Sequence, residues 1–196
     1  MIDALPFTCA EEWREWLAAS HDSERECWIA IPRRASGIPG ITYVEAVREA
    51  LCFGWIDGQS RGVDDDWFVQ RFTPRRLDSV WSQRMRALAI ELIDAGMMHS
   101  AGLAAVERAR ANGRWDSAYA GPATIEVPPV LREALEAAPR AAEAFRRLDA
   151  QNRYAILHRL AITKTEATRA RTAARYVAML ERGELLYPAR KQARNR

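Results

Sequence analysis

The stretch Trp55-Ile-Asp-Gly-Gln-Ser-Arg61, followed five residues later by Trp67-Phe-Val-Gln-Arg-Phe-Thr73, decides the fold. The second run is rich in aromatic and β-branched residues, which favour strands, and the first begins with Trp55 and Ile56. Gly62-Val-Asp-Asp-Asp66 between them has the composition of a turn. Pro74 ends the second run, because proline cannot donate to a strand ladder. The pattern predicts a central β-hairpin with a loop of about five residues.

Helical spacing surrounds this hairpin on both sides. A short strand is expected over 27–31, and helices are expected over 8–20 and 42–53, each opened by a capping box, Thr8 with Glu11 and Thr42 with Glu45. Further apolar spacing predicts a helix over 80–95 that carries Trp81 and ends before Gly96, and another over 100–112. The segment 121–129 has the composition of a linker, and the rest of the chain is expected to be helical, over 129–138, 139–149, 152–162 and 164–183.

These elements predict an α+β fold: a small antiparallel sheet with a central hairpin packed by helices, followed by an all-helical C-terminal part. We expect an α+β core with a ligand pocket over 1–120, a helical subdomain over 121–185 and a basic tail over 186–196.

Composition narrows the class of protein. The chain has 196 residues, of which 48% are hydrophobic, so it can fill a real core. No apolar run is long enough to cross a membrane, and the first residues lack the features of a signal peptide. The three cysteines are widely spaced and form no CxxC pair, which argues against a disulfide scaffold. A cytoplasmic protein with no membrane span is therefore expected.

Charge is divided unevenly along the chain. Residues 139–196 carry a net charge of +9, whereas the remaining residues carry −6. A basic stripe is predicted on the last helix, formed by Lys164, Arg171, Arg175 and Arg182. It could bind nucleic acid weakly, although a solvated helix face has the same pattern. No nucleic-acid-binding motif and no interleaved aromatic residues accompany the stripe, which argues against nucleic acid as a partner.

The hairpin offers the first group of candidate site residues. A loop of five residues would set Asp57 opposite Arg71, with Trp55, Asp57, Gln59 and Arg61 on one face. This pair is either an ordinary cross-strand ion pair or the polar floor of a pocket, in which Arg71 would lower the pKa of Asp57. Gly58 in mid-strand suggests a bulge or a close approach, which favours the pocket.

The segment after the hairpin offers the second group. Arg75, Arg76, Asp78 and Ser79 precede the helix predicted to carry Trp81, and helix N-termini bind anions readily. The alternative is that Asp78 or Ser79 only caps the helix. Trp55, Trp67 and Trp81 could form apolar walls, although tryptophans at this spacing also serve as core.

Other chemistries receive little support. Glu45 could act as a general acid or base beside Asp57, but its capping box already explains it. The histidines His21, His99 and His158 show no metal-ligand spacing, and no phosphate-binding, dinucleotide-binding or nucleophile-elbow motif occurs. We therefore expect neither a metal nor a cofactor.

Several blocks of the sequence resemble the YdeI/OmpD-associated, or bacteriocin-protection, family over about residues 5–185. They are Tyr43-Val-Glu-Ala-Val47, Ala50-Leu-Cys-Phe-Gly-Trp-Ile-Asp-Gly58, Arg71-Phe-Thr-Pro-Arg-Arg76 and Ser79-Val-Trp-Ser82, with Lys164, Glu166, Thr168 and Arg169 nearer the C-terminus. The resemblance implies a cytoplasmic bacterial protein linked to stress or antimicrobial-peptide tolerance. The polar residues of the family pattern, together with a tryptophan, correspond in this sequence to Glu45, Asp57, Arg71, Arg75, Ser79 and Trp81. Met85 stands where the family pattern usually has Asn.

The sequence thus predicts a stress or resistance protein that binds a small anionic or aromatic molecule between the 55–73 hairpin and the 80–95 helix. The predicted ligand-binding residues are Trp55, Asp57, Arg71, Arg75, Ser79 and Trp81. The alternative is a cofactor-free enzyme that uses Asp57 or Glu45 for acid–base catalysis on a similar molecule. The oligomeric state is left open.

Overall fold

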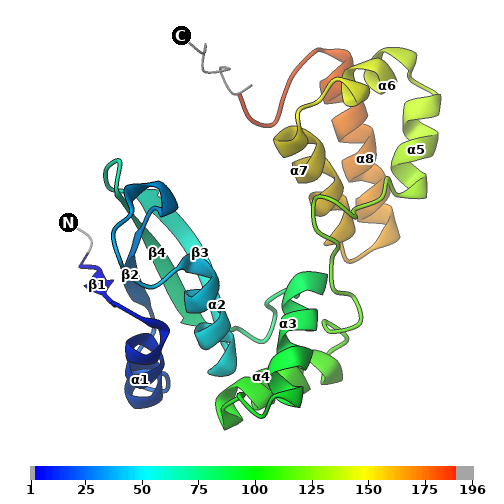
Figure 1. Ribbon diagram of the computed structural model, residues 1–196. Helices are drawn as coiled ribbons and strands as arrows, with labels where there is room; N and C mark the ends of the chain where they lie inside the picture. Colours follow the sequence, from blue (N-terminus) through cyan, green and yellow to red (C-terminus); the bar gives the residue numbers. More distant parts are fainter. Residues whose placement is uncertain (1–2, 189–196) are drawn as a thin grey trace. The chain divides into compact units, whose positions relative to one another are not determined.

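The computed structural model describes residues 3–188, and the chain divides into two compact units, Met1–Ala118 (unit 1) and Tyr119–Arg196 (unit 2) (Figure 1). Within the described residues, unit 1 holds a four-stranded sheet and the helices α1 to α4, and unit 2 holds the helices α5 to α8. The α+β class predicted from the sequence is confirmed.

The sheet of unit 1 is built from β1 (Leu5–Pro6), β2 (Cys27–Pro32), β3 (Trp55–Gly62) and β4 (Trp67–Pro74) in the order β1-β2-β4-β3. The predicted hairpin is confirmed, with a loop over 63–66 that is one residue shorter than expected. β1 runs parallel to β2, so the sheet is mixed and not purely antiparallel. Two exposed residues carry too little pattern for β1 to be visible in the sequence.

The helices of unit 1 are α1 (Ala10–Ser20), α2 (Tyr43–Cys52), α3 (Gln83–Asp94) and α4 (Ser100–Ala111), with a short 3-10 turn over Arg34–Ser36. The capping box of α2 is confirmed: Thr42 accepts from the Glu45 amide, and Glu45 accepts from the Thr42 amide. The box predicted for α1 is wrong. Its N-cap is Cys9, and Thr8 donates its amide and hydroxyl to Glu12, one residue further along the helix.

Helix α3 begins later than predicted. Ser82 is its N-cap and accepts from the Met85 amide, so Trp81 lies in the segment before the helix and not on it. Ser79 is therefore several residues from the free amides of the first turn, and the anion-binding helix N-terminus expected there does not form at Ser79.

Next to the loop, the predicted register of the hairpin is off by two residues, since Arg61 pairs with Val69 and not with Trp67. A bulge between Asp57 and Ser60 reduces the error to one residue, so that Asp57 pairs with Phe72 and not with Arg71. The bulge explains Gly58 in mid-strand. Gln70, buried on β4, donates its amide to the carbonyls of Gly58 and Gln59, the two residues of the bulge that have no register partner on β4.

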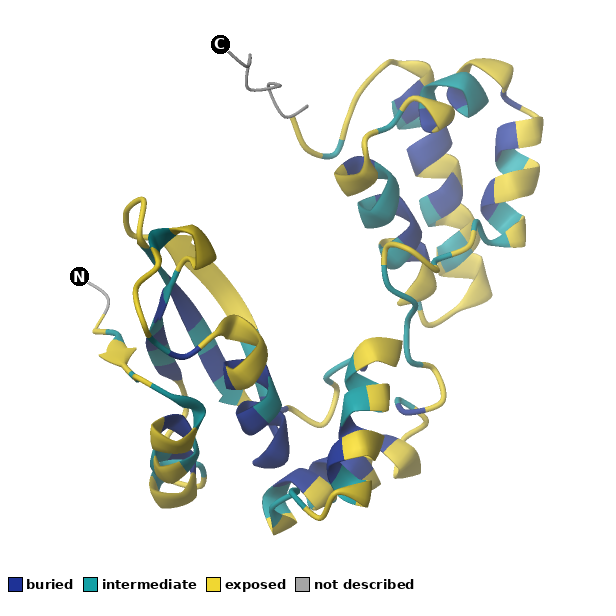
Figure 2. Ribbon diagram, in the orientation of Figure 1, coloured by how far each residue is buried: buried dark blue, intermediate teal, exposed yellow. Residues whose placement is uncertain are grey.

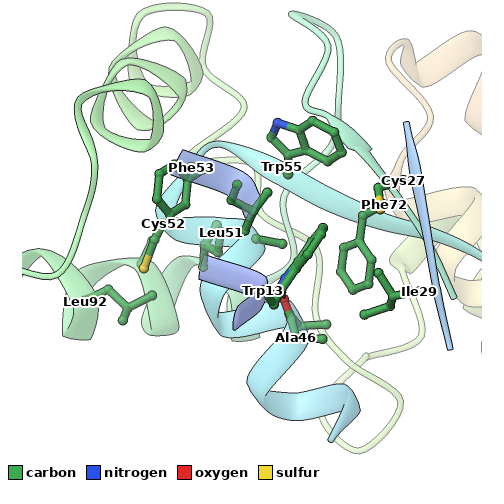
Figure 3. Packing of buried hydrophobic residues seen from close by; sticks show 14 of the residues in the cluster. Trp13, Cys27, Ile29, Ala46, Leu51, Cys52, Phe53, Trp55, Phe72 and Leu92 are labelled. Atoms are coloured by element: carbon green, nitrogen blue, oxygen red, sulfur yellow. Dashed lines mark hydrogen bonds between the residues drawn. The ribbon is translucent and has the colours of Figure 1, made fainter. Parts of the chain in front are cut away.

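One tryptophan forms the centre of the unit 1 core (Figure 3). The side chain of Trp13 on α1 is fully buried, and its ring lies 5.5 Å from Phe72 on β4 and 6.5 Å from Trp55 on β3 between centroids. Its Nε1 donates to the carbonyl of Ala46 on α2 at 3.1 Å. Trp13 thus joins α1 and α2 to one face of the sheet while leaving no polar atom of its ring unsatisfied.

Helices α2 and α4 meet at a glycine. A Cβ on Gly102 would lie 2.2 Å from the carbonyl oxygen of Cys52, which also accepts a hydrogen bond from the His99 amide. Only a residue without a side chain lets the two backbones approach this closely.

Unit 2 is a bundle of α5 (Pro129–Glu136), α6 (Pro139–Arg146), α7 (Ala150–Ala161) and α8 (Glu166–Glu181). Each helix has a buried side and an exposed side (Figure 2). The fully buried residues come from all four helices: Leu131, Ala141, Ile156, Leu160 and Ala173. Beyond α8, Asn152 holds the chain by a pair of hydrogen bonds with the backbone of Tyr187. The predicted basic tail begins at residue 186, and its residues 189–196 lie outside the described part.

We predict that Trp13→Ala destabilises unit 1 by about 3–5 kcal/mol, since it removes a fully buried indole and leaves a cavity. All seven tryptophans lie in unit 1, so tryptophan fluorescence during urea unfolding reports on this unit alone. Trp28→Ala, at a half-buried position on the other face of the sheet, is the control and should cost clearly less. Equal losses of unfolding free energy in the two variants would contradict the central position of Trp13 in the core.

We also predict that Gly102→Ala lowers the stability of unit 1 by about 1–3 kcal/mol, because its methyl group would press on backbone. Gly58→Ala is the control within unit 1, since a Cβ built there would meet only Arg71, at ordinary contact distances of 3.7 and 4.0 Å. The midpoint of thermal unfolding should fall only for Gly102→Ala.

Candidate functional site

A polar cleft of about 900 Å³ lies on unit 1. Its lining comes from three segments: the loop over 22–26 between α1 and β2, the strands β3 and β4, and the chain over 74–79 that follows the hairpin. The charged and hydroxyl residues among them are Asp22, Ser23, Glu24, Arg25, Glu26, Arg71, Thr73, Arg76 and Ser79.

The cleft opens on the face of the sheet opposite Trp13. Residues paired across antiparallel strands share a face, so Asp57 lies on the core side with its partner Phe72. Arg71, one position along β4, lies on the other side with its partner Trp28. Asp57 and Arg71 are therefore separated by the sheet and form no ion pair, which corrects the predicted cross-strand pair.

Each member of that predicted pair has a different partner. Asp57 accepts a hydrogen bond from the hydroxyl of Tyr43 on α2 at 2.7 Å. Arg71 donates from Nε to Glu26 at 2.8 Å, with a second bond from Nη2 to the same oxygen. The side chains of Arg71 and Glu26 remain 36% and 46% exposed, so this ion pair stays in contact with solvent at the cleft wall.

Two of the three arginines that line the cleft, Arg25 and Arg76, have no acidic partner. In residues 3–188, no carboxylate lies within ion-pair distance of either guanidinium. A tight turn fixes the neighbouring backbone: the Arg76 amide donates to Ser79 Oγ at 3.0 Å, and the Ser79 amide donates to the Arg76 carbonyl. Arg76 and Ser79 are thus placed side by side in the cleft wall.

Arg75 does not line this cleft. Its guanidinium is buried, lies 4.0 Å from the centre of the Trp81 ring and donates to the Val80 carbonyl. Trp81 is itself buried against Trp115. The hollow beside Arg75 has a volume of only about 10 Å³, which leaves no room for a ligand. In this structure Arg75 and Trp81 act as packing residues.

Two further predicted residues have structural roles outside the cleft. Trp55 is buried and donates from Nε1 to the His21 carbonyl at 3.2 Å. Glu45 stays in its capping box, where hydrogen bonds from the Thr42 amide and hydroxyl hold the pKa of its carboxyl below the usual value. A lowered pKa suits a helix cap, whereas a general acid at neutral pH needs a raised one.

The cleft therefore contains Arg71, Arg76 and Ser79 from the sequence analysis, but not Trp55, Asp57, Arg75 or Trp81. Sequence reasoning missed the loop over 22–26, which supplies Arg25 and Glu26. The charged residues of this loop match no site motif in the sequence. Only the tertiary fold brings them beside β4.

Some other classes of site find no support within residues 3–188. No group of three metal-ligating side chains lies together, and none of the helices in that range is long and apolar enough to span a bilayer.

The basic stripe predicted on the last helix is only partly formed on α8. Lys164 precedes the helix, and Arg182, its C-cap, pairs with Glu184. Within α8, Arg171 donates to the Thr168 hydroxyl, and the guanidinium of Arg175 lies 5.2 Å from the Tyr176 ring centroid.

The fold and the cleft define a two-unit α+β protein with an arginine-lined surface cleft and a helical second unit. Residues 5–105, just over half of the chain, match a domain of unknown function, DUF8412, and residues 124–183 match the family described as Bacteriocin-protection, YdeI or OmpD-Associated. The chain belongs to the first family, and over residues 124–183 it is similar to the second. No curated protein and no solved structure matches the chain.

The resemblance to the bacteriocin-protection family is confirmed over residues 124–183, a shorter segment than the expected range of about 5–185. The pattern from Lys164 to Arg169 lies in the matched segment, whereas the blocks over 43–82 lie in the segment that matches DUF8412. Met85, where Asn was expected, packs against the hydrophobic core of unit 1.

Adjacent arginines allow a direct test of the packing role. We predict that Arg75→Ala destabilises unit 1 by about 2 kcal/mol, because it removes a buried cation–π contact and a hydrogen bond. Arg76→Ala, at an exposed position, should leave stability unchanged within about 0.5 kcal/mol. Urea unfolding followed by tryptophan fluorescence measures both, and an unaffected Arg75→Ala would show that Arg75 is not needed for packing.

Thiol labelling tests the burial of the cysteines. Burial raises the pKa of the Cys27 thiol to about 12 and also raises the pKa of the Cys52 thiol, so both stay protonated at pH 8. Only half-exposed Cys9 should react with iodoacetamide in the native protein, as counted by mass spectrometry. All three should react after unfolding in urea; rapid native labelling of Cys27 or Cys52 would contradict the structure.

Proposed function

We propose that this protein is a small-molecule-binding stress or antimicrobial-resistance protein of the bacteriocin-protection type, and that its ligand binds in the polar cleft of unit 1. The observation that carries the proposal is that Arg76, which has no acidic partner within residues 3–188, lines a cleft of about 900 Å³ together with Arg71 and Ser79. This volume is within the range of small-molecule sites.

The arginines can exchange their partners at little cost. An ion pair as exposed as Arg71–Glu26 contributes about 0–1 kcal/mol, so an anionic group that bonds to both guanidinium ions can displace Glu26. Guanidinium groups bind carboxylate and phosphate through two parallel N–H bonds, which gives such a ligand a defined orientation. Ser79 adds a hydroxyl to the same wall.

The lining also selects among ligand types. Among the described residues, 3–188, no aromatic side chain lines the cleft, so the proposal favours the anionic class over the aromatic class of ligand. The acidic residues Asp22 and Glu24 line it as well, and they would accept from an amine or hydroxyl group. The best fit is a small polar molecule that carries an anionic group together with hydrogen-bond donors.

Binding without chemistry is favoured over the enzyme alternative. The two carboxylates proposed for catalysis, Asp57 and Glu45, do not line the cleft and hold structural hydrogen bonds. A protective role is part of the proposal and derives from the family matched within unit 2, whose description names bacteriocin protection. A cytoplasmic location is proposed along with it.

A ligand screen with matched arginine variants tests the proposal. The panel contains carboxylic acids, amino acids and sugar phosphates, and thermal shift followed by calorimetry measures their binding. We expect at least one anion to bind the wild type, and to bind Arg76→Gln about tenfold or more weakly. Arg84→Gln, at an exposed position on α3 that does not line the cleft, is the control and should bind like the wild type.

Two outcomes would count against the proposal. If no anion binds, or if Arg76→Gln and Arg84→Gln bind equally, the cleft is not the ligand site. If the bound molecule is recovered chemically changed and Asp57→Asn abolishes that change, the enzyme alternative replaces simple binding.

A further inference from the structure

Unit 2 has a groove of its own, which is independent of the cleft proposed above. It has a volume of about 510 Å³ and is lined by residues from α5, α6, α7 and the chain before α5. Most of its surface is apolar, from the residues Val127, Leu135, Pro139, Ala142 and Phe145. The volume is that of a small-molecule site, and the whole groove lies within the segment that matches the bacteriocin-protection family.

Three arginines line this apolar surface, against one acidic residue, Glu136. The guanidinium of Arg153 lies 4.5 Å from the centre of the Phe145 ring and so forms part of the groove wall. Arg132 donates from Nη2 to the Val127 carbonyl at 3.3 Å, and Arg146 pairs with Glu143 outside the groove. The groove thus carries a net positive charge.

Of the three arginines, Arg153 is the one best placed to bind an anion in the groove. Across residues 3–188, no carboxylate forms an ion pair with Arg153 or with Arg132. A guanidinium that lies over an aromatic ring keeps the N–H groups at its edge free to bond an anion. Because Arg153 is half-buried beside apolar side chains, an anion bonded to it would meet a local dielectric lower than that of water.

We propose that this groove binds an amphiphilic organic anion, with its apolar body against Leu135, Ala142 and Phe145 and its single anionic head at Arg153. The apolar lining disfavours small polar anions, which would leave most of the groove unfilled, and the positive charge disfavours amphiphilic cations. A free fatty acid and an anionic membrane lipid share this chemistry.

Calorimetry with three eight-carbon probes tests the proposal on the full chain. Octanoate, 1-octanol and octylammonium have the same apolar body and differ in the charge of the head group. We expect octanoate to bind at least about tenfold more tightly than octanol, and octylammonium to bind most weakly. Vesicles of phosphatidylcholine with and without phosphatidylglycerol form a second arm. Because the basic C-terminal part attracts anionic surfaces by itself, only sedimentation with the anionic vesicles that Arg175→Gln keeps and Arg153→Gln loses would identify a bilayer lipid as the source.

Variants then locate the site. Arg153→Gln should reduce the preference for octanoate over octanol to less than about threefold. Arg175→Gln removes another arginine that lies on an aromatic ring, 5.2 Å from the Tyr176 centroid and outside the groove, and should keep the full preference. Ala142→Met, which fills the groove with apolar atoms, should weaken octanoate and octanol alike.

Three results would overturn the proposal: equal affinity for octanoate and octanol, an equal loss in Arg153→Gln and Arg175→Gln, or no binding of any probe. Circular dichroism confirms that each variant is folded. Since none of these variants alters the cleft of unit 1, a failure here is distinguishable from a failure of the function proposed for that cleft.

Discussion

The fold of unit 1 depends on the complete burial of Trp13. This one side chain contacts strands from both halves of the hairpin and, through its Nε1, the backbone of α2. An indole can be buried fully only where its N–H finds an acceptor, so the position of α2 over the sheet is fixed by the Ala46 carbonyl as well as by packing. With α1 and α2 fixed on one face, the polar residues of the cleft gather on the other face of the same sheet.

The bulge in β3 has a comparable influence on the site. It changes the register between Asp57 and Ser60, and the buried amide of Gln70 satisfies carbonyls that the irregular ladder exposes. As a result Arg61 pairs with Val69 and lies over Trp28 on the outer face, 5.5 Å from its ring centroid, although uninterrupted alternation would set it with Asp57. The chemistry of each face is therefore decided by a single extra residue.

The arginines of this protein have different roles, and the role of each depends on how far its side chain is buried. Arg75 is enclosed between Trp81 and a backbone carbonyl, whereas its neighbour Arg76 faces the cleft. Arg14 bonds to buried Glu49 and to the Met97 carbonyl, and so joins α1 to α2 and to the chain after α3. The burial of Arg153 in unit 2 is intermediate between that of Arg75 and that of Arg76, since its guanidinium lies over the Phe145 ring and also lines a groove. The residue type alone does not reveal which of these roles a given arginine has.

The sequence by itself determined the α+β class, the hairpin, the order of the helices and the capping box of α2, because periodicity, turn composition and caps depend on residues close together in the chain. Only the tertiary structure decided the parallel pairing of β1, the bulge, the partner of Arg71 and the burial of Arg75 and Trp81. A shift of one residue in register moves every following side chain to the other face, and local pattern does not detect such a shift. Glu26, 45 positions away from Arg71, becomes its partner only when β2 and β4 pair, because that contact depends on the whole sheet.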